Sequence, residues 1–258
     1  MKKNLIAPFF FAILFFMLLL ACNNETKPEE KTAATDTTKT VTPAPATNND
    51  DMSAAKVAPN LYHVLKDTLG IRIVEADYKP GDSSVMHWHP DYAVITAEGG
   101  TVTFYGKDGS KMEAPMKTGM TAIKPGEFHS VKNTGKTAIK VILVEVNRTG
   151  ASSMPDAALD ATKSGAGLYT TLNDTLGMRI LAINYKPGQS STMHAHSDAA
   201  LYVTDPGTAE FTGKDGKKQT IKLDKGMAMI SPAQTHSVKN VGKTTMKAFL
   251  VEVNRAMK

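Results

Sequence analysis

The chain repeats itself, and this internal duplication limits what the 258 residues can fold into more than any other feature. Residues 61–148 align with residues 168–255 without a gap, and 47 of the 88 aligned pairs are identical. Such a repeat encodes two copies of one structural module. We therefore predict a first domain at 60–148, a linker at 149–167 and a second domain at 168–258. A module this short buries only a modest core by itself, so we expect the two domains to pack together.

Each copy has the residue pattern of an all-β domain. Ile71–Tyr78 is rich in β-branched residues and ends at a Lys-Pro-Gly turn signal. Residues 102–105 precede Lys-Asp-Gly, which is typical of a hairpin. Further short strands are expected at 119–124, 128–132 and 138–146. Many short strands separated by turns indicate a sandwich or barrel.

The amino terminus has the features of an export signal. Two lysines precede residues 5–20, which are apolar except for Pro8. This stretch is shorter than the roughly 20 residues of a membrane-spanning helix, and it fits the apolar core of a secretory signal. The following Leu-Leu-Ala-Cys22 resembles the lipobox of bacterial lipoproteins, in which the signal is cleaved before the cysteine and the thiol is lipidated. We predict a signal peptide at 1–21; the alternative is an uncleaved anchor helix.

A lipidated Cys22 would place the protein outside the cytoplasm, anchored to a membrane of the cell envelope. Asn23 follows where an inner-membrane retention signal often has Asp, which favours the outer membrane. Residues 22–59 are predicted to form a disordered tether, because residues 23–59 contain no aromatic side chain and are rich in Thr, Ala and Pro. Short helices are expected near 52–57 and in the linker near 155–162.

Composition excludes other classes of protein. Cys22 is the only cysteine, so an intramolecular disulfide and a cysteine-rich zinc site are both impossible. The formal net charge of +5 comes from scattered residues without a basic stripe, which argues against nucleic-acid binding.

Six of the seven histidines form two matching sets. Residues i and i+2 of a strand point to the same face, so the H-x-H pair presents two imidazoles side by side, and a third histidine follows 40 residues later. Three convergent imidazoles suit a divalent transition metal, namely Fe, Mn, Zn, Ni or Cu. The alternative is that the histidines are polar fillers of a barrel interior. The predicted ligands are His87, His89 and His129 in the first copy and His194, His196 and His236 in the second.

At these residues the sequence resembles the cupin superfamily, and the two copies together resemble a bicupin. The first cupin motif is a Gly, five residues and H-x-H, as in Gly81 to His89 and again from Gly188. The second motif begins with a Gly, five residues and a Pro, and it ends with a His, three intervening residues and an Asn, as in His129 and Asn133. The resemblance implies two cupin-type β-barrels, or jelly rolls, in tandem, with the histidines facing each barrel interior.

The sequence departs from the cupin pattern at one ligand. Cupins usually place a metal-binding Glu four or five residues after H-x-H, where this chain has only apolar residues (Ala93, Val94, Ala200 and Leu201). The pattern H-x-H-x-D offers Asp91 and Asp198 instead. Each is either an extra metal ligand, or a residue that hydrogen-bonds a histidine or caps a turn.

Other residues retained in both copies receive simpler interpretations. Arg72 and Glu145, like Arg179 and Glu252, are expected at exposed strand positions or in a salt bridge. The copies also differ: Trp88 becomes Ala195 and Tyr92 becomes Ala199. If these residues line a pocket mouth, the two sites would accept different ligands.

Three hypotheses about function remain open. The chain is a metal-dependent cupin oxidoreductase, isomerase or lyase acting on a small oxygenated substrate, with catalytic residues unassigned. It is a non-catalytic lipoprotein that binds a metal or a small ligand. Or it is a structural domain without metal, against which the retention of all six histidines argues.

Overall fold

The computed structural model describes residues 49–150, 155–165 and 167–256. The predicted signal peptide, Cys22 and the tether up to residue 48 lie outside the described residues. Within the described ranges, no helix is long and apolar enough to cross a membrane.

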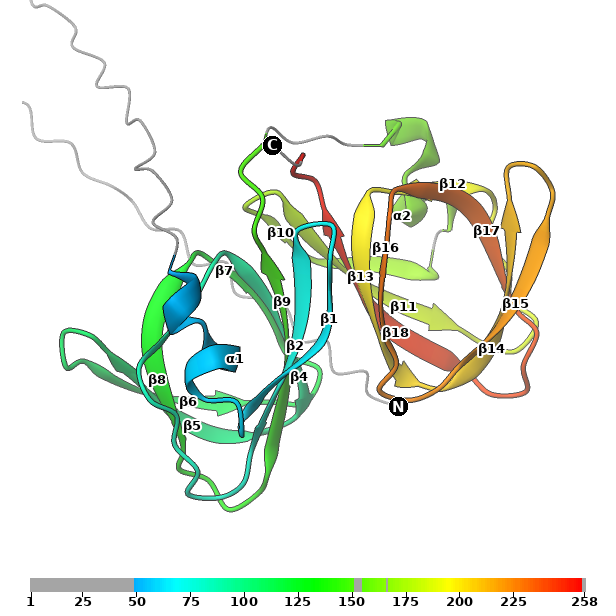
Figure 1. Ribbon diagram of the computed structural model, residues 1–258. Coiled ribbons are helices and arrows are strands. Elements are labelled where there is room, and N and C mark those ends of the chain that lie inside the picture. The colour runs from blue at the N-terminus through cyan, green and yellow to red at the C-terminus, as the bar shows by residue number, and fades with distance from the viewer. Residues whose placement is uncertain (1–48, 151–154, 166, 257–258) are drawn as a thin grey trace, which may run out of the picture. The chain divides into compact units, whose positions relative to one another are not determined.

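The fold is all-β, with two jelly-roll halves in tandem, as the sequence predicts (Figure 1). The first copy comprises β1 (Tyr62–Thr68), β2 (Ile71–Tyr78), β3 (His87–His89), β4 (Tyr92–Glu98), β5 (Gly100–Gly106), β6 (Lys111–Met116), β7 (Thr121–Lys124), β8 (Glu127–Asn133) and β9 (Ile139–Val146). The second comprises β10 (Tyr169–Thr175), β11 (Met178–Tyr185), β12 (His194–His196), β13 (Asp198–Asp205), β14 (Gly207–Gly213), β15 (Lys218–Leu223), β16 (Ala228–Ser231), β17 (Gln234–Asn240) and β18 (Met246–Val253).

Each copy consists of two antiparallel sheets whose strand order does not follow the sequence. In the first copy a five-stranded sheet has the order β1-β2-β9-β4-β7, and a four-stranded sheet has the order β3-β8-β5-β6. The second copy repeats these orders as β10-β11-β18-β13-β16 and β12-β17-β14-β15. The crossovers bring the two histidine-bearing strands of each copy, far apart in sequence, next to each other.

Strand β9 is apolar on both faces because both faces are buried. Val141 and Leu143 pack in the core of the first copy. Ile142 and Val144, which alternate with them, belong to another buried cluster that also contains Ile180 of the second copy. We call this cluster the shared core; its buried members are Ile71, Ile73, Ala93, Ile95, Ile142, Val144, Val146, Met178, Ile180, Ala200, Tyr202, Val251 and Val253.

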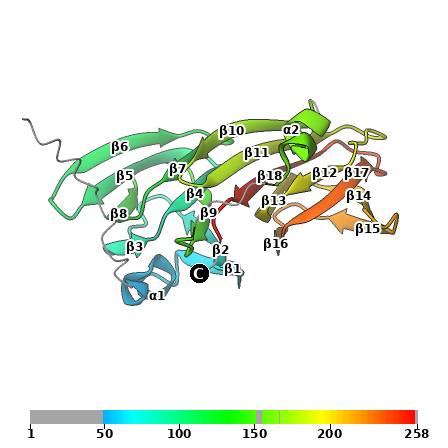
Figure 2. The same cartoon turned by 90° about the horizontal axis from the view of Figure 1, so that it is seen from above.

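Short helices occur in both regions where the sequence suggests them. Helix α1 (Ala54–Val57) follows a 3₁₀ turn at Asp50–Met52 and lies beside β1 (Figure 2). Ala54 and Ala58 are buried in the core of the first copy, so the described fold begins ahead of residue 60. Helix α2 (Ala161–Ser164) follows a 3₁₀ turn at Ala157–Leu159, and its N-cap Asp160 accepts a hydrogen bond from the backbone N–H of Thr162.

Candidate metal centres

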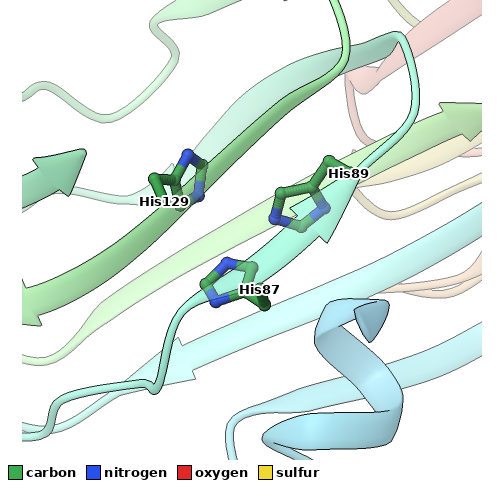
Figure 3. A group of neighbouring side chains, drawn as sticks. All are labelled: His87, His89 and His129. Atoms are coloured by element: carbon green, nitrogen blue, oxygen red, sulfur yellow. The ribbon is translucent and has the colours of Figure 1, made fainter. Parts of the chain in front are cut away.

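The six predicted histidines come together in two groups of three. Strands β3 and β8 pair antiparallel with His87 opposite His129, and His89 lies on the same face of β3 as His87. Figure 3 shows the three imidazoles of the first copy directed toward one another. Within each group, one nitrogen of each ring lies within 4.8 Å of the others. The second group consists of His194, His196 and His236.

All six imidazoles are buried, and burial lowers the pKa of four of them. Burial, together with the neighbouring His89, lowers the pKa of His87 to about 3. Burial lowers the pKa of His194 to about 4, and burial with the neighbouring His194 and His196 lowers that of His236 to about 3. Burial also lowers the pKa of His129. Neutral imidazoles keep the lone pair that a metal ion requires.

Acceptors outside the centre orient two rings of each group. The Nδ1 atom of His87 lies 2.8 Å from the carbonyl oxygen of Val85, and Nδ1 of His89 lies 2.7 Å from Glu145 Oε1. Both partners only accept hydrogen bonds, so each Nδ1 carries the proton and each Nε2 keeps the lone pair that would bind a metal. The second copy repeats both contacts, with Thr192 for His194 and Glu252 for His196.

The role of Glu145 escaped the sequence analysis. Its side chain is only 2% exposed, so the expectation of an exposed strand position is wrong. The expected salt bridge exists: Arg72 Nη1 lies 3.6 Å from Glu145 Oε2, and Arg179 Nε donates to Glu252 Oε2 at 2.6 Å. On the inward face of β9, Glu145 reaches His89 from 56 residues away. The one indication in the sequence was that Glu145 is the only acidic residue within the otherwise apolar residues 141–146.

A pair of tyrosines, also missed, approaches each centre. Tyr78 donates a hydrogen bond to the Tyr62 hydroxyl at 2.7 Å, and the Tyr62 hydroxyl lies 3.0 Å from His87 Nε2. Tyr62 therefore directs its own proton at the nitrogen that a metal would use. Metal binding and this hydrogen bond compete for one lone pair, so the phenol must turn away when the metal binds. Tyr185, Tyr169 and His194 repeat the arrangement.

The third histidine has different surroundings in the two copies. Nδ1 of His129 lies 3.4 Å from Glu127 Oε1, which also accepts a 2.6 Å hydrogen bond from the Tyr92 hydroxyl. The bonds from His129 and Tyr92 lower the pKa of Glu127 to about 2, so it is ionised. In the second copy Gln234 replaces Glu127, and the buried Nδ1 of His236 has no hydrogen-bond partner among the described residues.

The two aspartates after H-x-H make other contacts. Strand β3 ends at His89, and the Asp91 carboxylate accepts hydrogen bonds from the backbone N–H of Gly126 and from Arg255 of the second copy, both at 2.7 Å. Asp198 likewise accepts from Ala233 N–H at 2.6 Å and from Arg148 at 2.7 Å. The turn-capping interpretation describes these contacts, whereas the histidine groups are formed without either aspartate.

Comparisons with known proteins agree with this geometry. A family model described as a cupin domain matches residues 74–145 and residues 182–252, which together exceed half of the chain. No curated protein sequence matches the chain significantly.

Solved structures with similar folds share little sequence with this chain. AerE from Microcystis aeruginosa is 12% identical over 75% of this chain and 97% of its own, with a TM-score of 0.52. Salicylate 1,2-dioxygenase from Pseudaminobacter salicylatoxidans is 12% identical over 74% and 76%, with a TM-score of 0.51. Oxalate decarboxylase from Bacillus subtilis, which has Mn(II) centres, is 13% identical over 80% and 72%, with a TM-score of 0.51. At such identities the likeness concerns the fold alone.

Proposed function

Because the chain belongs to the cupin domain family and carries the domain twice, we propose that it binds one divalent transition metal ion in each copy. His87, His89 and His129 would hold the ion in the first copy, and the matching trio would hold it in the second. When bound, such an ion supplies a Lewis acid that polarises an oxygen ligand or activates water.

One observation carries this proposal: in each copy two imidazoles donate through Nδ1 to acceptors outside the centre, so that their Nε2 atoms carry lone pairs for a common ion. A carboxylate or carbonyl on the remote nitrogen is the usual support of a metal-bound histidine. The burial that lowers the pKa of His87, His194 and His236 would also exclude competing protons near pH 7. An all-imidazole donor set suits Fe, Mn, Zn, Ni or Cu.

The wider activity we propose is action on a small oxygenated substrate that binds beside the three histidines. The structures of similar fold include a dioxygenase and a decarboxylase, and the Tyr62 hydroxyl is a proton-bearing group beside the centre. The competing candidate is a non-catalytic protein that captures a metal or small ligand. Its support is the apolar side chain at each position of the usual cupin Glu (Ala93, Val94, Ala200 and Leu201).

We also propose that Cys22 anchors the protein to a membrane of the cell envelope, with the outer membrane favoured by Asn23. The lipobox-like sequence before Cys22 supports this proposal. Substitution Cys22→Ala should abolish signal cleavage and acylation, so that the uncleaved precursor accumulates and carries no fatty acid. Unchanged processing and acylation would refute the lipid anchor and leave the metal centres unaffected.

Elemental mass spectrometry of the purified chain tests the metal proposal. We expect about two metal ions per chain, about one in His87→Ala and in His194→Ala, and none in the double variant. His63→Ala is the matched control, because His63 is exposed and belongs to neither group. A wild-type chain that takes up none of the five metals on titration would refute the proposal.

A further inference from the structure

The two copies enclose cavities of different size beside their histidines. In the second copy one cavity of about 620 Å³ reaches His196 and His236. In the first copy the corresponding space is divided into a chamber of about 70 Å³ beside His89 and His129 and an outer cavity of about 390 Å³. Cavities of 300–1,000 Å³ hold organic ligands. The inner chamber of the first copy is far too small, and its outer cavity is large enough but reaches only His129 of the three histidines.

Two substitutions between the copies explain this difference. Tyr92 lines both cavities of the first copy, and its hydroxyl is fixed by the 2.6 Å hydrogen bond to Glu127. The second copy has Ala199 in place of Tyr92 and Gln234 in place of Glu127. The second copy therefore lacks both the Tyr92 phenol that divides the cavity of the first copy and the Glu127 carboxylate that holds this phenol in place.

A further difference widens the second cavity. Thr235, which lines it, stands where the first copy has Phe128. Trp88 packs against Phe128 with ring centroids 4.8 Å apart, and the matching Ala195 does not line the large cavity. Of the two differences noted in the sequence, the change from Tyr92 to Ala199 is the one that alters the cavity.

The walls of the large cavity are mainly aliphatic. Its apolar lining includes Leu201, Ile221, Leu223, Met229, Val238 and Leu250. Its polar lining includes the imidazoles of His196 and His236, and its charged lining residues are Asp215, Lys217, Lys218 and Lys247. A ligand that fills this space must therefore have an extended apolar body and a polar group for the histidine end.

Charge indicates that this polar group is an anion. Imidazole ligands bring no negative charge, so a divalent ion held by three of them would keep its full positive charge, and the nearby Glu252 is already bonded to His196 and Arg179. In the first copy Glu127 places a carboxylate beside His129. In the second copy the neutral Gln234 supplies no such charge. A ligand carboxylate would balance the ion there.

We propose that the second copy, and not the first, binds an aliphatic carboxylate, with the carboxylate at the histidine centre and the chain along the apolar wall. In the first copy the outer cavity reaches His129 but neither His87 nor His89, and Tyr92, which Glu127 holds in place, lines both this cavity and the inner chamber. This inference rests on the proposed metal site, because the metal supplies the charge that selects an anion.

Isothermal titration of the metal-loaded full chain with octanoate tests the inference. We expect one octanoate per chain, and at least tenfold weaker binding of 1-octanol, which has the same chain without the charge. Ala199→Tyr should weaken octanoate binding at least tenfold while leaving metal content at the wild-type value. The reciprocal variant Tyr92→Ala with Glu127→Gln should open a second octanoate site.

Three results would overturn the inference while the metal site stands: no octanoate binding to metal-loaded protein, two equal sites in the wild type, or binding unaffected by Ala199→Tyr. Metal content is measured on the same samples, so a chain that binds no metal is recognised separately as a failure of the proposed function. If such a metal-free chain binds octanoate no more tightly than 1-octanol, the anion selectivity is overturned as well.

Discussion

Glu145 and Glu252 are the residues on which the histidine centres most depend beyond the ligands themselves. Each carboxylate is buried and accepts the Nδ1 proton of the second histidine of H-x-H at 2.7 Å. The negative charge raises the basicity of the ring at Nε2 and fixes its orientation.

Replacing Glu145 with Gln should therefore weaken metal binding by the first copy about 10- to 100-fold. The neutral amide still accepts a hydrogen bond but removes the charge. Metal affinity is measured in a His194→Ala background, where only the first copy contributes. Glu113→Gln, an exposed acid on β6, is the control and should change nothing. Equal affinity in both variants would show that Glu145 does not support the ligand.

Sequence reasoning finds the two histidine groups but not the residues that support them. The H-x-H spacing identifies His87 and His89 because alternation along one strand is a local property. Tyr62 lies 25 residues from its histidine and Glu145 lies 56 residues away. Their approach depends on the order of strands in the sheets, which local spacing does not contain.

Among the structural elements, the turn from β8 to β9 depends on one buried side chain. Asn133 donates through Nδ2 to the carbonyl oxygens of Tyr78 and Thr137, at 2.9 and 2.8 Å, and accepts from the Gly135 N–H at 3.0 Å. It thereby fixes the end of β2 against the turn. Asn240 makes the same three kinds of bond in the second copy.

Asn133→Ala should lower the free energy of unfolding by about 2–4 kcal/mol, because it leaves buried backbone groups without partners. Urea denaturation measures the change. Asn147→Ala is the control, since the Asn147 side chain is exposed and only its backbone N–H bonds to Gly70. If both variants unfold at the same urea concentration, the turn does not need the Asn133 side chain.

Strand positions follow from the sequence more readily than strand partners. The prediction of Ile71–Tyr78 matches β2, and the strand predicted at 138–146 is β9 at Ile139–Val146. Turn residues bound both segments, which makes them visible locally. That β9 lies between β2 and β4 is set by the packing of both its faces, including the shared core.

At the scale of the whole described molecule, the two copies share buried contacts. The shared core takes residues from both copies. Two ion pairs cross between them, Arg255 with Asp91 and Arg148 with Asp198, each at 2.7 Å. Each aspartate lies two residues after H-x-H, so these pairs connect the surroundings of the two centres.

We therefore expect one cooperative unfolding transition in calorimetry. Ile180→Ala, a fully buried change in the shared core, should lower the free energy of unfolding by about 2–5 kcal/mol and shift the whole transition. Val64→Ala, at an exposed position on β1, is the control. Two separate transitions, with only that of the second copy shifted, would show that the copies fold independently.

The histidines of both copies together predict how the metal-free protein responds to acid. An unfolded histidine takes up a proton near pH 6.5, whereas the folded protein protonates His194 near pH 4 and His87 and His236 near pH 3. The unfolded state thus binds more protons between these values. The free energy of unfolding therefore falls as the pH falls from about 6.5 toward 4.

Urea denaturation of the metal-free chain at pH 7.5, 6 and 5 measures this loss. The double variant His87→Gln, His236→Gln should lose less stability over the same interval, because two of the titrating groups are absent. A wild-type chain that is equally stable at pH 7.5 and pH 5 would contradict the neutral, buried state of these imidazoles.

The most direct test of the metal centres is X-ray diffraction from crystals of the metal-loaded protein, recorded on both sides of the absorption edge of the bound metal. The account predicts one anomalous peak in each copy, about 2.0–2.3 Å from the ring nitrogens of its three histidines. Ordered trios without a peak, or peaks located away from both trios, would contradict it.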